Sequence, residues 1–209
     1  GRIKSRSFDV CLEAVRKCLD DTKIIKIEGD DIGAYGLDIN TNCIELFKSM
    51  FEVDADNKIE WHFENFNPGW LVKYIDSLIE IFENKRVTYF ACPIQTGVSR
   101  ILKLMNRFSN IELIAQSLIR LKTAIPAVSL NSSIIVGFPS ETEEEFRETL
   151  EVIKRIGFSG IALLHYADRP YAKSYYMDNK IDREVILKRL EYGKAELEKA
   201  GIDVAIDVG

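Results

Sequence analysis

This sequence lacks the marks of a membrane protein and of a basic nucleic-acid-binding domain. It contains no apolar run long enough to cross a bilayer. Its 28 Lys and Arg are outnumbered by 33 Asp and Glu, and the net charge of −5 excludes a broadly basic surface. Proline and glycine are scarce as well, with 5 and 12 of the 209 residues, so no low-complexity linker is expected.

Cysteine is rare and is not arranged as a metal site or a disulfide framework. The four cysteines are Cys11, Cys18, Cys43 and Cys92, and their spacing matches no metal motif. Cys11 and Cys18 are seven residues apart in an expected helix, which places both on one face. Because free cysteine is among the most buried residue types, we expect these two in the core. A reduced, cytoplasmic setting follows as the simplest expectation.

What the sequence does contain is a regular alternation of apolar strands and amphipathic helices. Five strands are expected at residues 23–28, 58–63, 86–92, 128–136 and 160–166. Six helices are expected at residues 8–19, 42–51, 68–83, 110–124, 142–156 and 182–200. This alternation predicts an α/β fold over residues 1–209, a single domain in which helices lie outside an open or closed parallel β/α barrel.

The first expected helix has no strand before it. In a β/α barrel each helix follows a strand, so the pattern predicts a truncated, partial open barrel with five of six strands. The strand at residues 23–28 would then have one unpaired edge. Such an edge is prone to pair with another chain, which makes it the candidate contact of a dimer.

The most informative segment is residues 134–146, where an apolar strand runs into a Gly-x-Pro turn and then into an acidic helix. Gly137 has no Cβ and lets a ligand approach the backbone. Thr142 and Glu145 have the spacing of a capping box, which sets the start of the helix. The acidic run that begins at Glu141 complements the helix dipole. A strand end and a helix N-terminus thus meet at one glycine, where α/β folds bind small ligands.

Four motifs in collinear order resemble the radical SAM methylthiotransferase family. They are GDDIGAYGLD at residues 29–38, PIQTGVSRILKLMNR at 93–107, GFPSETEEEF at 137–146 and YADRP at 166–170. Each lies at the end of an expected strand, and residues 1–7 are similar to the segment that follows the cluster loop of the family. Members of this family add a methylthio group to adenosines of tRNA or to an aspartate of a ribosomal protein. The loop at residues 33–36 favours a modified adenosine of tRNA as the substrate.

The resemblance implies two cofactors, S-adenosylmethionine and a [4Fe–4S] cluster. It implies that Gly29 and Asp30 lie where the methionyl amino group binds, that Gln95 meets the ribose, and that Gly137 flanks the adenine. Arg169 is expected to hold a carboxylate or a substrate phosphate through its guanidinium fork. Each residue also has a simpler interpretation, as a turn, a loop hydrogen bond or a surface ion pair.

Several positions depart from the family pattern. The Cys-x-x-x-Cys-x-x-Cys motif that holds the cluster is absent from the sequence, as are the flanking domains through which the family grips tRNA. The 209 residues are therefore expected to be an inactive fragment of a longer enzyme. Single-residue departures are Thr96 and Val98 for serines, Ser133 for an aspartate, Ser140 and Tyr171 for glycines, and His62 for an arginine.

Two other functions remain open on the sequence alone. A degenerate barrel would act only in binding or assembly. A metal-dependent barrel hydrolase would use His62, His165 and Asp168, because these residues fall near expected strand ends and are of metal-binding types.

Overall fold

The computed structural model describes residues 3–208 and contains two compact units. Residues 1–92 and 120–129 form the first unit, and residues 93–119 and 130–209 form the second. Gly1 and Arg2, which open the segment similar to the family, lie outside the described residues, as does Gly209.

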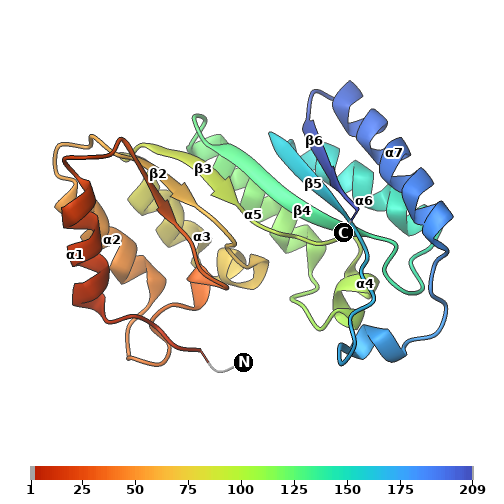
Figure 1. Cartoon of the computed structure of the whole chain (residues 1–209). Helices are drawn as coiled ribbons and strands as arrows, with labels where there is room; N and C mark the ends of the chain where they lie inside the picture. Colours follow the sequence, from red (N-terminus) through yellow and green to blue (C-terminus); the bar gives the residue numbers. More distant parts are fainter. Residues whose placement is uncertain (1–2, 209) are drawn as a thin grey trace. The chain divides into compact units, whose positions relative to one another are not determined.

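The first unit contains a three-stranded parallel sheet (Figure 1). Its elements are α1 (Phe8–Cys18), β1 (Ile24–Ile27), η1 (Ile32–Ala34), α2 (Cys43–Val53), β2 (Glu60–Phe63), α3 (Pro68–Phe82) and β3 (Val87–Ala91). Strand β1 pairs with β2, and β2 pairs with β3 across a register shift between Trp61 and His62. Along its other edge, β1 has no strand partner among residues 3–208.

The two faces of this sheet differ because side chains alternate along each strand. Trp61 and Phe63 of β2 are fully buried, and the ring of Phe63 lies 4.9 Å from that of Phe82 in α3. His62 lies between them in sequence and points to the opposite face, where its ring stacks on Tyr89 of β3 at 5.3 Å. Helices therefore cover the aromatic face of the sheet, and the other face carries polar residues.

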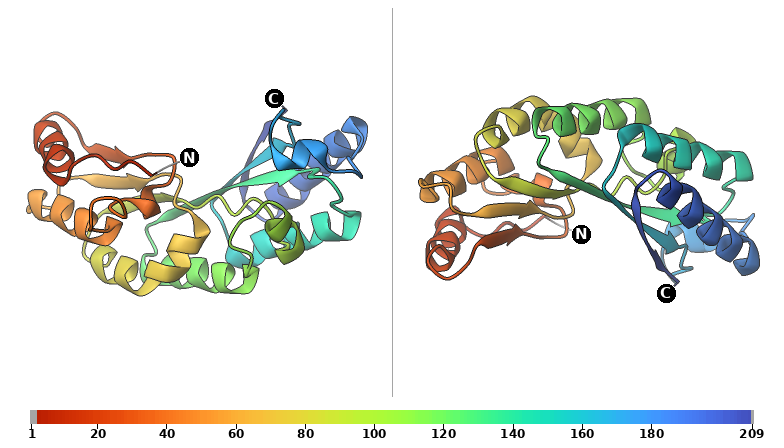
Figure 2. Two further views of the ribbon diagram at one scale, coloured as in Figure 1. Left: turned by 90° about the horizontal axis from the view of Figure 1, so that it is seen from below. Right: turned by 90° about the horizontal axis from the view of Figure 1, so that it is seen from above.

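The second unit repeats the parallel arrangement with three further strands (Figure 1). Its elements are α4 (Ser99–Leu104), α5 (Ile111–Ala124), β4 (Ser129–Val136), α6 (Glu143–Ile156), β5 (Gly160–His165), η2 (Lys173–Tyr176), α7 (Arg183–Lys199) and β6 (Asp203–Asp207). Strand β5 pairs with β4 on one side and with β6 on the other. Helix α7, in blue in Figure 2, packs on β5 and β6.

The expected alternation of parallel strands and helices is confirmed. Every expected element is present with ends within two residues of those predicted. The structure contains one more strand than the sequence pattern predicted, because residues 203–207 pair with β5 as β6. This strand begins and ends with aspartate, which is depleted in strands, and its residues are half-buried or exposed. Its sequence signal is therefore weak.

The prediction of a core position was wrong for two cysteines. Cys18 is exposed and Cys11 is half-buried, whereas Cys43 and Cys92 are buried. Cys11 and Cys18 share one helical face with Val15, which is the buried position of α1. The face was correctly identified, but the packing of α1 covers only its centre.

The turn after β4 packs against α7. Gly137 has a φ of +86°, and a Cβ at this position would lie 2.4 Å from Cδ1 and Cγ1 of Ile186. Atoms in a close-packed interior do not approach so closely, so only glycine fits here without a shift of α7. The space that the missing Cβ leaves is thus filled by Ile186.

Replacement of Gly137 by alanine should lower the free energy of unfolding by about 2–4 kcal/mol, since overpacking adds to an unfavourable left-handed backbone. Gly201 is the matched control, because its φ is +77° and nothing lies within 4 Å of its Cβ position. Gly201→Ala should cost only about 1 kcal/mol. Urea unfolding measures both values, and equal losses would show that the contact with Ile186 does not constrain the turn.

Candidate functional site

A buried carboxylate holds the turn that follows β4. Glu141 is 5% exposed, and its Oε2 accepts a hydrogen bond of 2.8 Å from the backbone N–H of Gly137. Nη1 of Arg189, on α7, lies 3.1 Å from the same oxygen. Burial raises the pKa of Glu141 to about 7, because desolvation outweighs the opposite effects of the Gly137 N–H and the Arg189 charge. Hydrogen bonds of a buried carboxyl group therefore connect this turn to α7.

The sequence pattern had assigned all of the acidic run to the helix dipole, and for Glu141 this was wrong. Thr142 and Glu145 do form the capping box, with bonds of 3.2 Å and 2.9 Å to each other's backbone N–H. Glu141 precedes the N-cap Thr142 and turns inward to Arg189 instead. A carboxylate at this position serves the packing of α7 rather than the start of α6.

Arg189 is a site residue that the sequence pattern missed. It is 8% exposed, and its Nε donates to Oε2 of Glu143 at 3.1 Å. The missed signal is periodicity: Arg189 follows Ile186 by three residues and precedes Gly193 by four, on the buried face of α7. An arginine on such a face requires an acidic partner nearby.

Gln95 extends the sheet beside β4 by one residue. Its N–H donates to the carbonyl of Ser133 at 3.0 Å, and its carbonyl accepts from the N–H of Ile135 at 2.9 Å. Its φ is +71°, which costs a non-glycine residue on the order of 1 kcal/mol. The residue is 7% exposed, and its Nε2 lies 3.3 Å from Oγ of Ser133. This strained backbone at a strand end gives Gln95 a defined orientation, and its contact with a ribose stays a prediction.

Gly29 and Asp30 follow β1 in the first unit, and both are exposed. Nδ2 of Asn65 lies 3.5 Å from the carbonyl oxygen of Gly29. The more constrained acid is the next residue, Asp31, whose Oδ2 accepts from the indole N–H of Trp70 at 3.1 Å. Burial raises the pKa of Asp31, and its Oδ1 is buried without a hydrogen-bond partner among the described residues. The expected contacts of Gly29 and Asp30 stay predictions.

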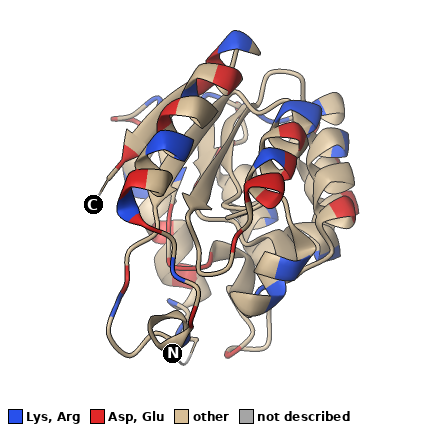
Figure 3. Cartoon of the chain, turned by 90° about the vertical axis from the view of Figure 1, so that its right-hand side faces the viewer, with Lys and Arg blue, Asp and Glu red and all other residues tan. Residues whose placement is uncertain are grey.

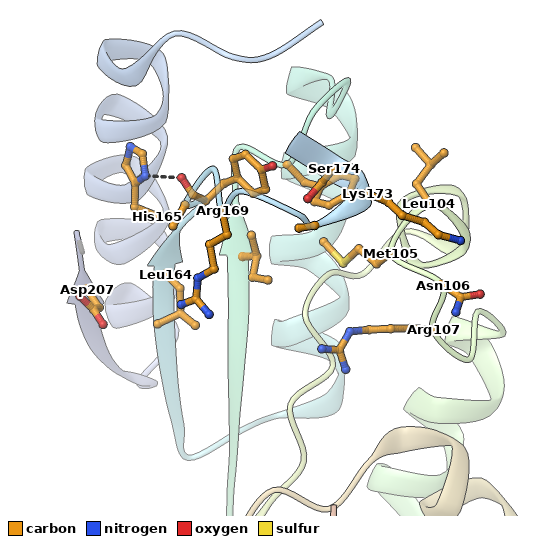
Figure 4. Close-up of a pocket in the computed structure, with 15 residues that line it drawn as sticks. Leu104, Met105, Asn106, Arg107, Leu164, His165, Arg169, Lys173, Ser174 and Asp207 are labelled. Carbon is orange, nitrogen blue, oxygen red and sulfur yellow. Dashed lines mark hydrogen bonds between the residues drawn. The ribbon is translucent and has the colours of Figure 1, made fainter. Parts of the chain in front are cut away.

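A cavity of about 500 Å³ opens at the carboxyl ends of β4 and β5, within the second unit (Figure 4). Its lining residues are Leu104, Met105, Asn106, Arg107, Ile135, Phe138, Leu164, His165, Tyr166, Ala167, Arg169, Ala172, Lys173, Ser174 and Asp207. Arg169 is one of these lining residues and follows the end of β5, and its contact with a ligand stays a prediction. Parallel β/α folds bind their ligands at this end of the strands.

The cavity is positively charged in a chain that is negative overall. Arg107, Arg169 and Lys173 line it, and Asp207 is its one carboxylate, although the net charge of the chain is −5. On the outer helices, by contrast, Lys and Arg alternate with Asp and Glu (Figure 3). Figure 4 shows the guanidinium groups of Arg169 and Arg107 extending into the space from different walls. This arrangement favours an anionic ligand with an apolar part, since Ile135 and other lining residues are apolar.

The residues of the predicted metal hydrolase serve other contacts. His62 stacks on Tyr89 in the first unit, and Nδ1 of His165 lies 2.6 Å from the carbonyl of Tyr166 in the second. Asp168 forms an ion pair with Lys180. Among residues 3–208, no three His, Cys, Asp or Glu side chains are placed to hold a metal ion. The geometry therefore gives no support to the metal-dependent alternative.

The cysteines do not fit an iron–sulfur cluster. Burial raises the pKa of Cys43 to about 12 and raises that of Cys92, so both thiols resist the deprotonation that iron ligation needs. Cys11 and Cys18 are seven residues apart on α1 rather than in a loop. The family's cluster ligands are therefore not among the four cysteines of this sequence.

Comparison with known proteins identifies the superfamily. A model of the Radical SAM superfamily matches residues 1–153. The chain is 29% identical over 203 residues to the tRNA-2-methylthio-N(6)-dimethylallyladenosine synthase of Hydrogenobaculum sp. (strain Y04AAS1), covering 96% of this chain and 45% of that protein. It is 31% identical over 208 residues to the ribosomal protein uS12 methylthiotransferase RimO of Thermosipho africanus (strain TCF52B), covering 98% and 48%. The chain thus spans about half the length of the curated relatives it matches.

The fold is shared with solved structures of the same superfamily. The radical SAM enzyme coproporphyrinogen III oxidase (HemN) of Escherichia coli superposes with a TM-score of 0.68 over 96% of this chain and 48% of that one, at 18% identity. At this identity the match concerns the fold alone. Within residues 3–208, no helix has the length and apolarity needed to cross a membrane.

The raised pKa of Glu141 predicts a pH-dependent stability. Glu141 is protonated at a higher pH in the folded chain than in the unfolded chain, so its ionisation opposes folding as the pH rises from about 4.5 through 7. Between pH 5 and pH 8, wild type should lose about 2 kcal/mol of stability relative to Glu141→Gln. Glu148→Gln, at an exposed position of α6, is the control and should follow wild type. A constant difference between wild type and Glu141→Gln at all pH values would contradict the shift.

Proposed function

Since the chain belongs to the radical SAM superfamily, we propose that it is the part of a methylthiotransferase that binds S-adenosylmethionine and presents the substrate. The observation that carries this proposal is the similarity of nearly the whole chain to two kinds of methylthiotransferase, one of which is named for a tRNA adenosine. We take a modified adenosine of tRNA as the substrate of the longer protein, because the family motif at residues 33–36 favours it. The [4Fe–4S] cluster and the tRNA-gripping domains would come from other parts of that protein.

Individual residues have separate parts in this proposal. In the second unit, the side-chain amide of Gln95 contacts the ribose of S-adenosylmethionine. Gly137 flanks the adenine through its backbone groups only, since Ile186 fills the space at its Cβ position. In the first unit, Gly29 and Asp30 contact the methionyl amino group, for which an exposed carboxylate is a suitable partner. Arg169 holds a phosphate of the substrate in the cavity at the ends of β4 and β5.

The remaining parts of the proposal concern setting and assembly. A reduced cytoplasmic environment suits a chain whose four cysteines form no disulfide among residues 3–208. The edge of β1 that has no strand partner among residues 3–208 is the surface through which two copies would associate. Size-exclusion chromatography with light scattering tests the second point directly.

The chain of 209 residues should bind S-adenosylmethionine no more tightly than about 1 mM, because association costs several kcal/mol and no iron chelates the methionyl end. Calorimetry with S-adenosylmethionine and S-adenosylhomocysteine measures this. Gln95→Ala and Asp30→Ala should weaken the binding further, whereas Gln116→Ala, at an exposed position of α5, should not. Submicromolar binding, or equal binding by all variants, would contradict the proposed contacts.

Anaerobic incubation with iron and sulfide should leave this chain without the absorption of a [4Fe–4S] cluster, since its cysteines lack the required spacing. The full-length protein, reconstituted in the same way, should add a methylthio group to tRNA, which mass spectrometry of digested nucleosides detects. A peptide from the ribosomal protein is the competing substrate. Modification of the peptide and not of tRNA would identify the protein-modifying activity instead.

A further inference from the structure

The exposed ring of Tyr171 has no structural explanation in the described residues. Tyr171 is 93% exposed and has a φ of +70°, a conformation that is rare for a bulky side chain. It stands where the family motif has glycine, the residue that adopts this conformation without strain. Burial cannot compensate for the strain, because the ring packs against almost nothing. Strained residues that persist in this way cluster at binding sites.

Two further tyrosines follow within five residues. Tyr176 is 72% exposed and Tyr175 is 40% exposed, and their rings meet edge to face at 5.2 Å. Nζ of Lys180 lies 4.7 Å from the centre of the Tyr175 ring. Residues 171–176 therefore present an aromatic surface to solvent at the rim of the cavity, whose lining includes Lys173 and Ser174 of the same segment.

Cations lie among these rings. Arg169 and Lys173 are both exposed, and neither has an ion-pair partner in the part of the chain that the structure describes. The net charge of the chain is −5, so these two cations beside exposed rings are a local positive feature of a chain that is negative overall. Alternation of rings and cations suits one class of partner, a nucleic acid strand whose bases are unstacked.

We propose that residues 169–176 form a stacking surface for an unpaired segment of RNA. The rings of Tyr171 and Tyr176 stack on bases, and Arg169 and Lys173 contact the adjacent phosphates. This inference rests on the proposed function for the presence of RNA, but it assigns recognition to residues at which this chain departs from its family. A mixed aromatic and cationic segment binds RNA strands of different base sequence, because every base has a face on which to stack.

Tyr171→Gly tests the role of the ring without loss of the fold. The variant removes the ring and relieves the backbone strain, so its melting temperature should not fall. Its affinity for a fluorescein-labelled single-stranded oligoribonucleotide should fall about fivefold to one hundredfold, whereas Tyr171→Phe should retain affinity. Ser140→Gly is the matched control: it relieves strain at another left-handed position, with a φ of +69°, and removes no ring. Its affinity should equal that of wild type.

A second comparison tests the cations. The double variant Arg169→Ala with Lys173→Ala should show a weaker salt dependence. The magnitude of its slope of log affinity against log salt should fall by about 1.4, which corresponds to two phosphate contacts on a single strand. Arg183→Ala with Lys188→Ala changes the net charge equally at exposed positions of α7 and should leave the slope unchanged. Equal slopes for the two double variants would overturn the phosphate contacts.

Three results would overturn the stacking surface: no binding of the oligoribonucleotide by wild type, equal affinities of wild type and Tyr171→Gly, or equal affinity for an abasic strand. Titration of Tyr171→Gly with S-adenosylmethionine separates this inference from the proposed function. Loss of RNA affinity with unchanged cofactor binding supports the stacking surface. Submicromolar binding of the cofactor by wild type would contradict the contacts of the proposed function and leave the RNA result standing.

Discussion

The second unit depends on how closely α7 can approach the turn after β4. Two contacts set this distance, the packing of Ile186 against the missing Cβ of Gly137 and the buried pair of Glu141 with Arg189. The first contact is a steric limit on the approach of α7, and the second is a polar attraction between the turn and α7. Both act on the backbone of residues 137–141. Because a buried polar group costs least when its partner is in place, the pair gives the helix one position rather than a range of positions. The strand ends that line the cavity are held by this contact.

Regular elements were predictable from the sequence because each has a strong local signal. Strand β4 alternates buried and half-buried residues, and α6 carries its own capping box, so tertiary contacts reinforce what the local sequence favours. Strand β6 is different. Its aspartates oppose strand formation, and it exists because β5 offers an unpaired edge next to the end of α7. A strand of that kind forms because a neighbouring strand is available for pairing, and its own sequence shows little strand propensity.

The candidate site was predictable only in part, for a similar reason. Arg169 could be placed at a strand end because the motif that contains it follows β5 directly. Its cationic neighbour Arg107 comes from the loop after α4, and Asp207 comes from β6, so their proximity depends on tertiary structure. Arg189 could not be paired with Glu141 from sequence, since 48 residues separate them. Long-range pairs of this type require the register of the sheet to be known first.

The residues that line the cavity at the ends of β4 and β5 are synthesised at very different times. Its wall begins at Leu104 and is completed by Asp207, about 100 residues later. At a synthesis rate of about 5–20 residues per second, roughly 5–20 s pass between the emergence of Arg107 and that of Asp207. In the later part of that interval β5 has been made but lacks its pairing with β6, and the lining of the cavity lacks Asp207. The full set of lining residues is consequently present only after Asp207 has been synthesised.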